Sequence, residues 1–230
     1  MAQKVYSLAA LRRAAPRTRQ REEAPGTGGV MTDEHTFRNV LALGFAVVFP
    51  FALYRRLKSQ ATGEPLDRSQ EGLFMLATLR PAGFACWGGL FAYLLKPAWM
   101  AWSSMPLPDW VRLAGIGLFV AGAALLVWTL RSLGPNLTDT VVTRKAHTLV
   151  TRGPYRWVRH PFYDSAAVLV LASALIAANW FVLLTGALVF VLLAVRTGTE
   201  EHHLLVRFGE SYRTYRDGTG RFLPRLSRMR

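Results

Sequence analysis

Cysteine is almost absent from the sequence. The only one, Cys86, lies inside a long apolar run. A single thiol can form neither a disulfide within the chain nor a thiolate metal cluster, so both are excluded. Acidic residues are also scarce: 14 Asp and Glu stand against 28 Lys and Arg, which gives a formal net charge of +14. In a soluble protein this excess would suggest nucleic-acid binding. The hydrophobic content of 51% indicates a membrane protein instead.

Five apolar runs are long enough, or nearly so, to cross a bilayer as helices. A helix of about 20 apolar residues spans the roughly 30 Å hydrocarbon core. The last two runs are separated only by Ala178-Asn179, which is typical of a tight helical hairpin. The sequence therefore predicts an all-α, polytopic integral membrane protein with about five transmembrane helices. The predicted spans are 37–57, 72–95, 110–130, 163–177 and 180–195.

Lys and Arg concentrate on one side of these spans. The segment 131–163 and the tail from Arg196 onward are rich in both, whereas the opposite loops offer only Lys96 and Arg112. The positive-inside rule then places the C-terminus and the 131–163 segment in the cytoplasm, most simply at the cell (inner) membrane. The same rule accounts for the net charge, so no nucleic-acid partner is expected.

The first thirty residues contradict this orientation, because five spans would place a strongly basic segment outside the cell. One explanation is that translation begins at Met31. The other is a disordered basic tail, since Pro16, Pro25 and the glycine-rich residues 26–29 offer no core-forming pattern. The segment also lacks the continuous apolar core of a signal peptide.

The rest of the chain divides into two parts. Residues 31–109 form the N-terminal transmembrane helices. Residues 110–230 form the candidate functional core, which contains the loop 131–163, the hairpin 163–195 and a C-terminal helix. That last helix is predicted to be amphipathic and to lie on the membrane, because apolar residues recur in it at helical spacing: Leu204, Leu205, Phe208, Tyr212 and Tyr215.

Two clusters of polar residues are expected to meet at the cytoplasmic face. Pro161 can occupy the first turn of a helix, so His160 would precede a helix N-terminus, which offers unpaired backbone donors. The hairpin returns the far end of the last span, with Arg196, Glu200 and Glu201, to the same face. Arg196 and Glu200 are four residues apart and could pair with each other, and the two carboxylates could equally hold a cation.

The segment 147–163, HTLVTRGPYRWVRHPFY, and the later segment EEHHLLVRFGESY make the sequence recognisable. An RHPxY element, one hairpin, a Glu-Glu pair and an FGxxY element follow in order. This combination resembles the integral-membrane isoprenylcysteine carboxyl methyltransferases and phospholipid N-methyltransferases, over about residues 110–226. The resemblance implies S-adenosylmethionine as the cofactor. It also implies these cofactor contacts: His147, Thr148, Leu149, Val150, Tyr155, His160, Pro161, Phe162, Tyr163 and Glu200.

The acceptor implied by the resemblance is lipid-tailed, and its chemistry is left open. A carboxylate needs no base, and Arg196 would orient it; an amine needs a base, for which Glu201 or His202 is the candidate. Arg80 is a second candidate for substrate binding, because a cation within a span is costly, although snorkelling to the interface also explains it. The family usually has Gly where this chain has Ser165.

Two other functions and a metal site are alternatives to methyl transfer. Some sterol reductases have a similar C-terminal helical arrangement, which makes a membrane reductase using NADPH an alternative. A non-catalytic lipid-binding protein that keeps the fold is another. A metal site at the Glu-Glu-His-His run is disfavoured, because adjacent residues of a helix point in different directions, so no metal is expected.

Overall fold

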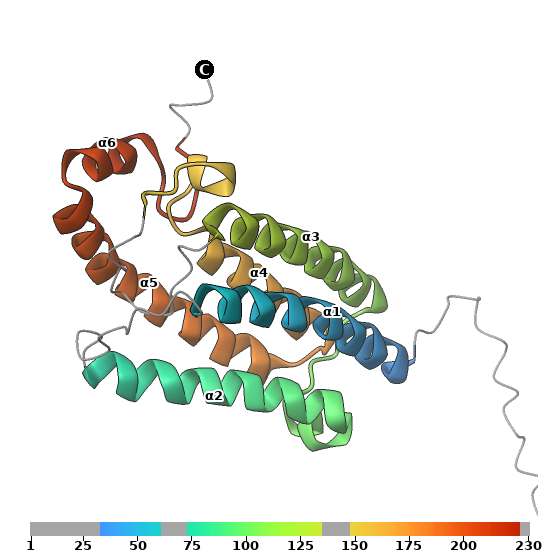
Figure 1. The fold of residues 1–230 in the computed structure, drawn as a ribbon. Coiled ribbons are helices and arrows are strands. Elements are labelled where there is room, and N and C mark those ends of the chain that lie inside the picture. Colours follow the sequence, from blue (N-terminus) through green and yellow to red (C-terminus); the bar gives the residue numbers. More distant parts are fainter. Residues whose placement is uncertain (1–32, 61–72, 135–147, 226–230) are drawn as a thin grey trace, which may run out of the picture. The chain divides into compact units, whose positions relative to one another are not determined.

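The structure, a computed structural model, describes residues 33–60, 73–134 and 148–225 (Figure 1). They belong to one compact unit, Thr32–Arg230. The predictions for the basic tail 1–30, the Met31 start and His147 lie outside the described ranges. All regular structure within those ranges is helical, and the elements are α1 Glu34–Gln60, α2 Leu73–Leu95, η3 Pro97–Ser103, α3 Asp109–Leu133, η5 Gly153–Arg156, α4 Pro161–Ile176, α5 Trp180–Phe208 and α6 Glu210–Gly218.

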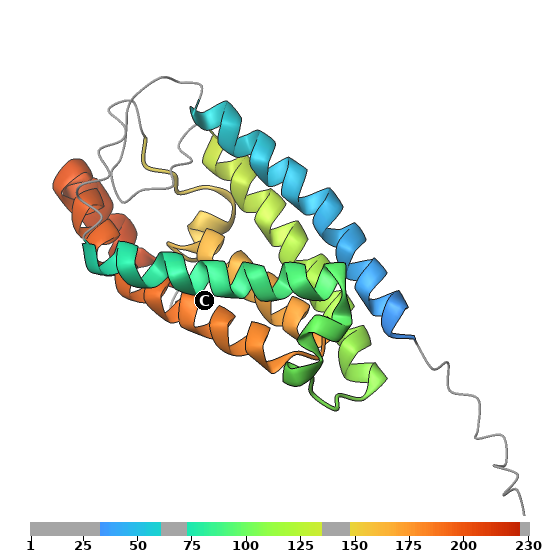
Figure 2. The same ribbon diagram turned by 90° about the horizontal axis from the view of Figure 1, so that it is seen from below.

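Each of the five predicted spans has become a helix. By length and composition, three of the described helices can cross a membrane: Glu34–Ser59, Asp109–Leu133 and Trp180–Phe208. The helix Pro161–Ile176 is apolar but shorter. The all-α prediction is therefore confirmed, and the count of five spans stays a prediction. In two views α1 runs along α3 and α2 along α5 (Figures 1 and 2).

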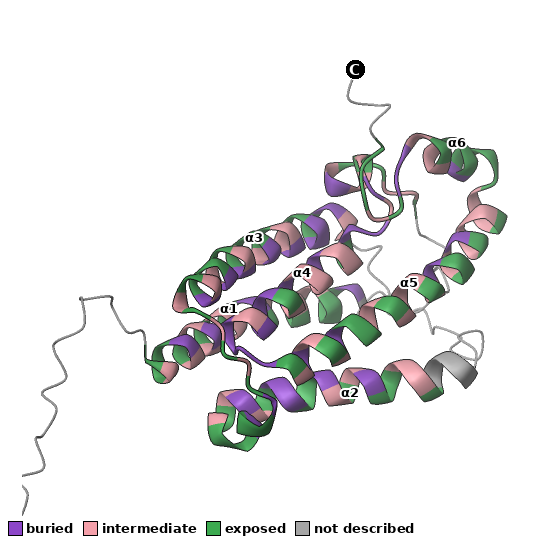
Figure 3. Ribbon diagram, turned by 180° about the vertical axis from the view of Figure 1, so that it is seen from behind, coloured by how far each residue is buried: buried purple, intermediate pink, exposed green. Residues whose placement is uncertain are grey.

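Glycines bring the central helices together. A Cβ atom on Gly122 of α3 would lie 2.9 Å from Val168 Cγ1 of α4, and one on Gly115 would lie 3.1 Å from Ile176 Cγ1. Gly186 of α5 is packed even more tightly against Val170 of α4. Small residues at helix interfaces are how membrane helices approach closely without a hydrophobic driving force between them. Helix α4 is thus held between α3 and α5, and exposed residues face outward around these helices (Figure 3).

The predicted hairpin between α4 and α5 is present. Asn179 caps α5 by accepting a hydrogen bond from Val182 N at 3.1 Å, and its Nδ2 donates to Ser103 Oγ at 2.8 Å. Ala178 takes a positive φ of 45°, which turns the chain between the two helices. Because the turn is this short, the start of α4 and the far half of α5 lie on the same side of the bundle.

A partly buried charged cluster lies at the other end of the helices, away from the start of α4. Arg112 of α3 donates from Nη1 to Glu34 Oε2 at 2.8 Å and from Nε to the Ile176 carbonyl at 2.8 Å. Tyr93 of α2 donates to Glu34 Oε1 at 2.6 Å, and the Arg112 guanidinium stacks 3.9 Å from the centre of the Phe37 ring. The cluster therefore joins α1, α2, α3 and the end of α4.

Candidate functional site

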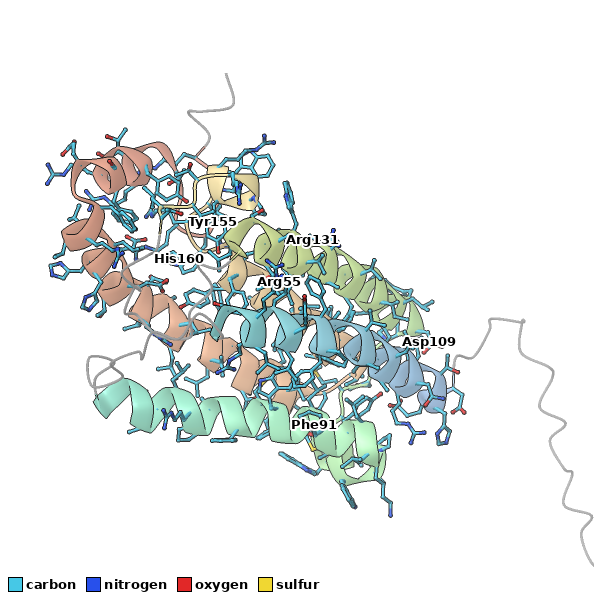
Figure 4. All side chains as sticks on the ribbon, in the orientation of Figure 1. Arg55, Phe91, Asp109, Arg131, Tyr155 and His160 are labelled. Carbon is cyan, nitrogen blue, oxygen red and sulfur yellow. The ribbon has the colours of Figure 1, made fainter. Side chains whose placement is uncertain are left out.

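His160 lies at the N-cap of α4, directly before Pro161, as the sequence predicts. Its side chain is 5% exposed. The imidazole stacks on Tyr163 with 5.5 Å between ring centroids and 3° between planes. Its Nε2 lies 3.1 Å from Glu201 Oε1. The His-Pro loop and the acidic end of α5 therefore touch, as the hairpin argument requires, and Figure 4 shows His160 and Tyr155 at this end.

The two adjacent carboxylates of α5 have different surroundings, because successive residues of a helix project about 100° apart. Glu200 is 28% exposed at its side chain and accepts a hydrogen bond from the Tyr163 hydroxyl at 2.9 Å. Glu201 is 7% exposed. It accepts hydrogen bonds from Arg159 Nε at 2.9 Å and from Arg221, whose Nη2 lies 3.1 Å from Oε2. The oxygens of Glu201 are thus occupied by hydrogen bonds within the protein, whereas Glu200 can still accept hydrogen bonds from a ligand.

The segment after α6 returns to the site, which the sequence did not predict. Gly209, with φ 53°, ends α5 and begins α6, so the chain turns back at this point. Arg159 N then donates to the Gly220 carbonyl at 2.9 Å, and His160 N donates to the Arg221 carbonyl at 3.1 Å. We call residues 219–222 the C-terminal strap. No local sequence signal predicts it, because the contacts span about sixty residues of chain.

Three tyrosines surround the carboxylates. Tyr215 donates to the Tyr155 carbonyl at 2.7 Å. Burial raises the pKa of the Tyr155 phenol, and the nearby Glu200 charge raises it further. Tyr212 is 1% exposed, and its hydroxyl has no hydrogen-bond partner among the described residues. Burial also raises the pKa of Tyr212, with Glu201 as the next contributor. The buried face of α6 thus packs against the site, and the predicted position of this helix on the membrane surface stays a prediction.

The other predicted site residues lie before η5, at the start of α4, on α5 and on α2. Thr148, Leu149 and Val150 precede η5 without regular structure, and Phe162 is 37% exposed at the start of α4. Arg196 lies one turn before Glu200 on α5, close enough for its charge to act on the Tyr163 hydroxyl. Arg80 is exposed on α2, and no described hydrogen bond or ion pair joins it to the site. Ser165, fully buried, donates to the Phe162 carbonyl at 2.8 Å.

The described residues hold no cluster of three or more His, Cys, Asp or Glu side chains that could bind a metal ion. His202 and His203 have ring centroids 6.2 Å apart. His202 is exposed on α5. The described side chains that meet at the site are carboxylates, one imidazole, guanidinium groups and phenols.

Comparison with known proteins shows which family part of this core is similar to. Residues 115–206 match the model of the isoprenylcysteine carboxyl methyltransferase (ICMT) family. The resemblance predicted from the sequence is confirmed. The ICMT segment contains His160, Tyr163, Glu200 and Glu201, whereas Tyr212 and the C-terminal strap lie beyond it.

Curated relatives of this segment are methyltransferases. The chain is 30% identical over 126 residues to protein-S-isoprenylcysteine O-methyltransferase of Rattus norvegicus, covering 54% of this chain and 44% of that protein. It is 29% identical over 145 residues to methanethiol S-methyltransferase of Mycobacterium tuberculosis, covering 63% and 51% respectively. The chain thus spans about half the length of these relatives.

A solved structure shares the fold. The eukaryotic intramembrane Ras methyltransferase ICMT superposes with a TM-score of 0.52 at 22% identity, covering 83% of this chain and 75% of that one. At this identity the match establishes the fold alone. Together with the apolar helices, it confirms a polytopic integral membrane protein.

Proposed function

We propose that this protein transfers a methyl group from S-adenosylmethionine to a lipid-tailed acceptor in the membrane. The observation that carries the proposal is the contact of His160 and Tyr163, at the start of α4, with Glu200 and Glu201, near the end of α5. The relatives of this segment support the reaction type. By the positive-inside rule, we place the site on the cytoplasmic side of the cell membrane.

The residues present fit the proposed cofactor. When bound, the cofactor supplies an electrophilic methyl group on a sulfonium, and it also carries an ammonium and a carboxylate. Glu200 is a partly exposed carboxylate fixed by Tyr163, which suits a cationic group. The Tyr212 hydroxyl is a buried donor near the carboxylates, and no described residue accepts a hydrogen bond from it. Aromatic faces of the kind that Tyr163 offers favour methylated cations.

The geometry favours an acceptor that is already anionic at neutral pH. Both oxygens of Glu201 accept hydrogen bonds from side chains of the protein, so this carboxylate is poorly placed to remove a proton from an amine. His202, the other candidate base, is exposed. A carboxylate acceptor needs no base. In this proposal Arg196 orients the acceptor, and alignment and exclusion of water by the surrounding residues lower the barrier.

Helix α5 offers a route from the bilayer to this point. Four exposed apolar residues lie on one face of the helix at intervals of three or four, and this face ends one residue before Arg196. A lipid tail can lie along such a face while its polar end reaches Arg196 and Glu200. The four residues are Leu184, Leu188, Val191 and Val195.

Thermal unfolding in detergent tests the cofactor. We expect S-adenosylhomocysteine, the methyl-depleted product, to raise the unfolding temperature, because a ligand at about 100 times its Kd stabilises the folded state by about 2.7 kcal/mol. NADPH should have no effect. Stabilisation by NADPH alone would favour the reductase, and stabilisation by neither would favour a non-catalytic lipid-binding protein.

Membranes incubated with donor labelled in its methyl group test the acceptor. A carboxyl methyl ester releases its label in mild alkali, whereas an N-methyl group does not. We expect alkali-labile label that partitions with lipid or with lipid-modified protein. The Glu200→Gln variant should lose most of this label, and Glu210→Gln, an exposed residue on α6, serves as the matched control. Alkali-stable label would overturn the carboxylate assignment.

A further inference from the structure

The C-terminal strap is built into the site by its backbone. Gly220 N donates to the Trp157 carbonyl at 3.2 Å, Arg159 N donates to the Gly220 carbonyl at 2.9 Å, and His160 N donates to the Arg221 carbonyl at 3.1 Å. These bonds form a short parallel pairing centred on Val158 and Gly220. The strap therefore fixes the backbone of the residues immediately before α4, including His160 itself.

Arg221 fastens the same strap to α5. Its Nε lies 3.2 Å from Glu201 Oε1, and its Nη2 lies 3.1 Å from Oε2, so the guanidinium grips both oxygens. Arg159 Nε and His160 Nε2 share Oε1 at 2.9 and 3.1 Å. Such charge-assisted, two-pronged pairing is geometrically specific, and Lys cannot reproduce it. One buried carboxylate thus holds together the helix, the loop and the strap.

Phe222 completes the arrangement. Its ring lies 5.8 Å from the His160 ring and 5.3 Å from Phe190 on α5. The His160 imidazole therefore contacts Tyr163, Phe222 and Glu201, and its orientation is set by all three. Of these, Phe222 lies outside the segment that matches the ICMT family.

From these contacts we propose that the C-terminal strap is a wall of the methyl-transfer site, and that Glu201 and Arg221 are positioning residues. Their pairing holds the strap against His160, so that Glu200 alone of the two adjacent carboxylates is presented to the cofactor. This inference rests on the proposed function for its activity readout. The pairing of strap and loop itself does not depend on what the site binds.

Coupling between Glu201 and Arg221 is the central test. We expect Glu201→Gln and Arg221→Gln each to weaken S-adenosylhomocysteine binding by about tenfold, since each removes a charge-assisted contact. The double variant should be no weaker than the worse single variant, because both changes release the same strap. The donor KM should rise more than kcat falls. Additive losses, with Arg221→Gln near wild type, would instead show that Glu201 contacts the ligand directly.

Gly220→Ala tests the strap without altering any charge. A Cβ at this position would fall on the Leu223 carbonyl group, which is backbone and cannot move aside as a flexible side chain would. We expect the same loss of S-adenosylhomocysteine binding as for Arg221→Gln, together with faster tryptic cleavage within residues 219–225. Arg213→Gln is the matched control, because Arg213 is exposed and pairs only with the exposed Glu210 among the described residues. Wild-type binding by Gly220→Ala would overturn the proposal.

The two proposals fail in different ways. If the wild-type protein does not bind S-adenosylhomocysteine, yet Glu201 and Arg221 are coupled in thermal stability, methyl transfer is refuted and the strap stands only as a structural element. If the wild-type protein binds the ligand and the strap variants bind it equally well, the proposed function stands and the strap is not a wall of the site.

Discussion

His160 Nε2 lies 3.1 Å from Glu201 Oε1, although 41 positions separate the two residues in the sequence. The short turn at Ala178-Asn179 makes this contact possible, because it lays α4 back along α5. Glu200, one position earlier, points to a more exposed environment and contacts Tyr163 instead. The site thus contains one carboxylate engaged in structure and one with capacity to bind a cation.

Glu200→Gln should weaken S-adenosylhomocysteine binding by about tenfold or more. A charge-assisted hydrogen bond contributes roughly 1.5 to 3 kcal/mol, and the amide keeps the shape but not the charge. Isothermal titration in detergent measures the affinity, with His202→Gln, an exposed neighbour on α5, as the control. Unchanged affinity would remove Glu200 from the site.

Tyr212→Phe should leave folding intact and still weaken ligand binding several-fold. The Tyr212 hydroxyl is buried and has no hydrogen-bond partner in the described part of the chain, and an unsatisfied buried polar group costs about 1 to 3 kcal/mol. Its removal should therefore leave the unfolding temperature of the ligand-free protein unchanged or raise it. A lower unfolding temperature, with ligand affinity unaltered, would show that the hydroxyl has only a structural role.

Local patterns were sufficient to predict the five long helices and the contact between the His-Pro loop and the end of α5. Continuous apolar runs predict the five long helices, and the short Ala178-Asn179 connection predicts which ends meet. The strap could not be predicted, because its bonds join Gly220 and Arg221 to residues some sixty positions earlier and leave no periodic signature. The separate roles of Glu200 and Glu201 were equally hidden, since they depend on where Arg159 and Arg221 lie in space.

The charged cluster around Arg112 was missed for a related reason. Arg112 was interpreted as a marker of the outer loop, and Glu34 lies just before the first predicted span. Each is an ordinary charge at the end of a span when it is considered by itself. Only the packing of α1 against α3 reveals that the two residues form an ion pair of 2.8 Å.

Gly122→Ala should destabilise the packing of α3 on α4, and Gly117→Ala should not. The new Cβ at Gly122 would lie 2.9 Å from Val168 Cγ1, and overpacking of this kind typically costs about 1 to 3 kcal/mol. Nothing lies within 4 Å of a Cβ at Gly117, where Ala should gain roughly 0.5 to 1 kcal/mol from helix propensity. Thermal unfolding of both variants in one detergent gives the comparison. Equal unfolding temperatures would contradict the glycine-mediated contact.

Arg112→Met should be the most destabilising single change at the far end of the bundle. It would remove a donor from the Glu34 carboxylate, which is 44% exposed at its side chain and keeps the bond from Tyr93, and it would take the Arg112 donor from the Ile176 carbonyl. Loss of a donor from a buried acceptor typically costs about 1 to 3 kcal/mol, which is the size of effect that we expect. The double variant Glu34→Gln with Arg112→Met should recover part of this loss, because no charge is then left unpaired. Thermal unfolding measures both. If the double variant is less stable than Arg112→Met, the remaining bonds of Glu34, such as that from Tyr93, contribute more to stability than its pairing with Arg112.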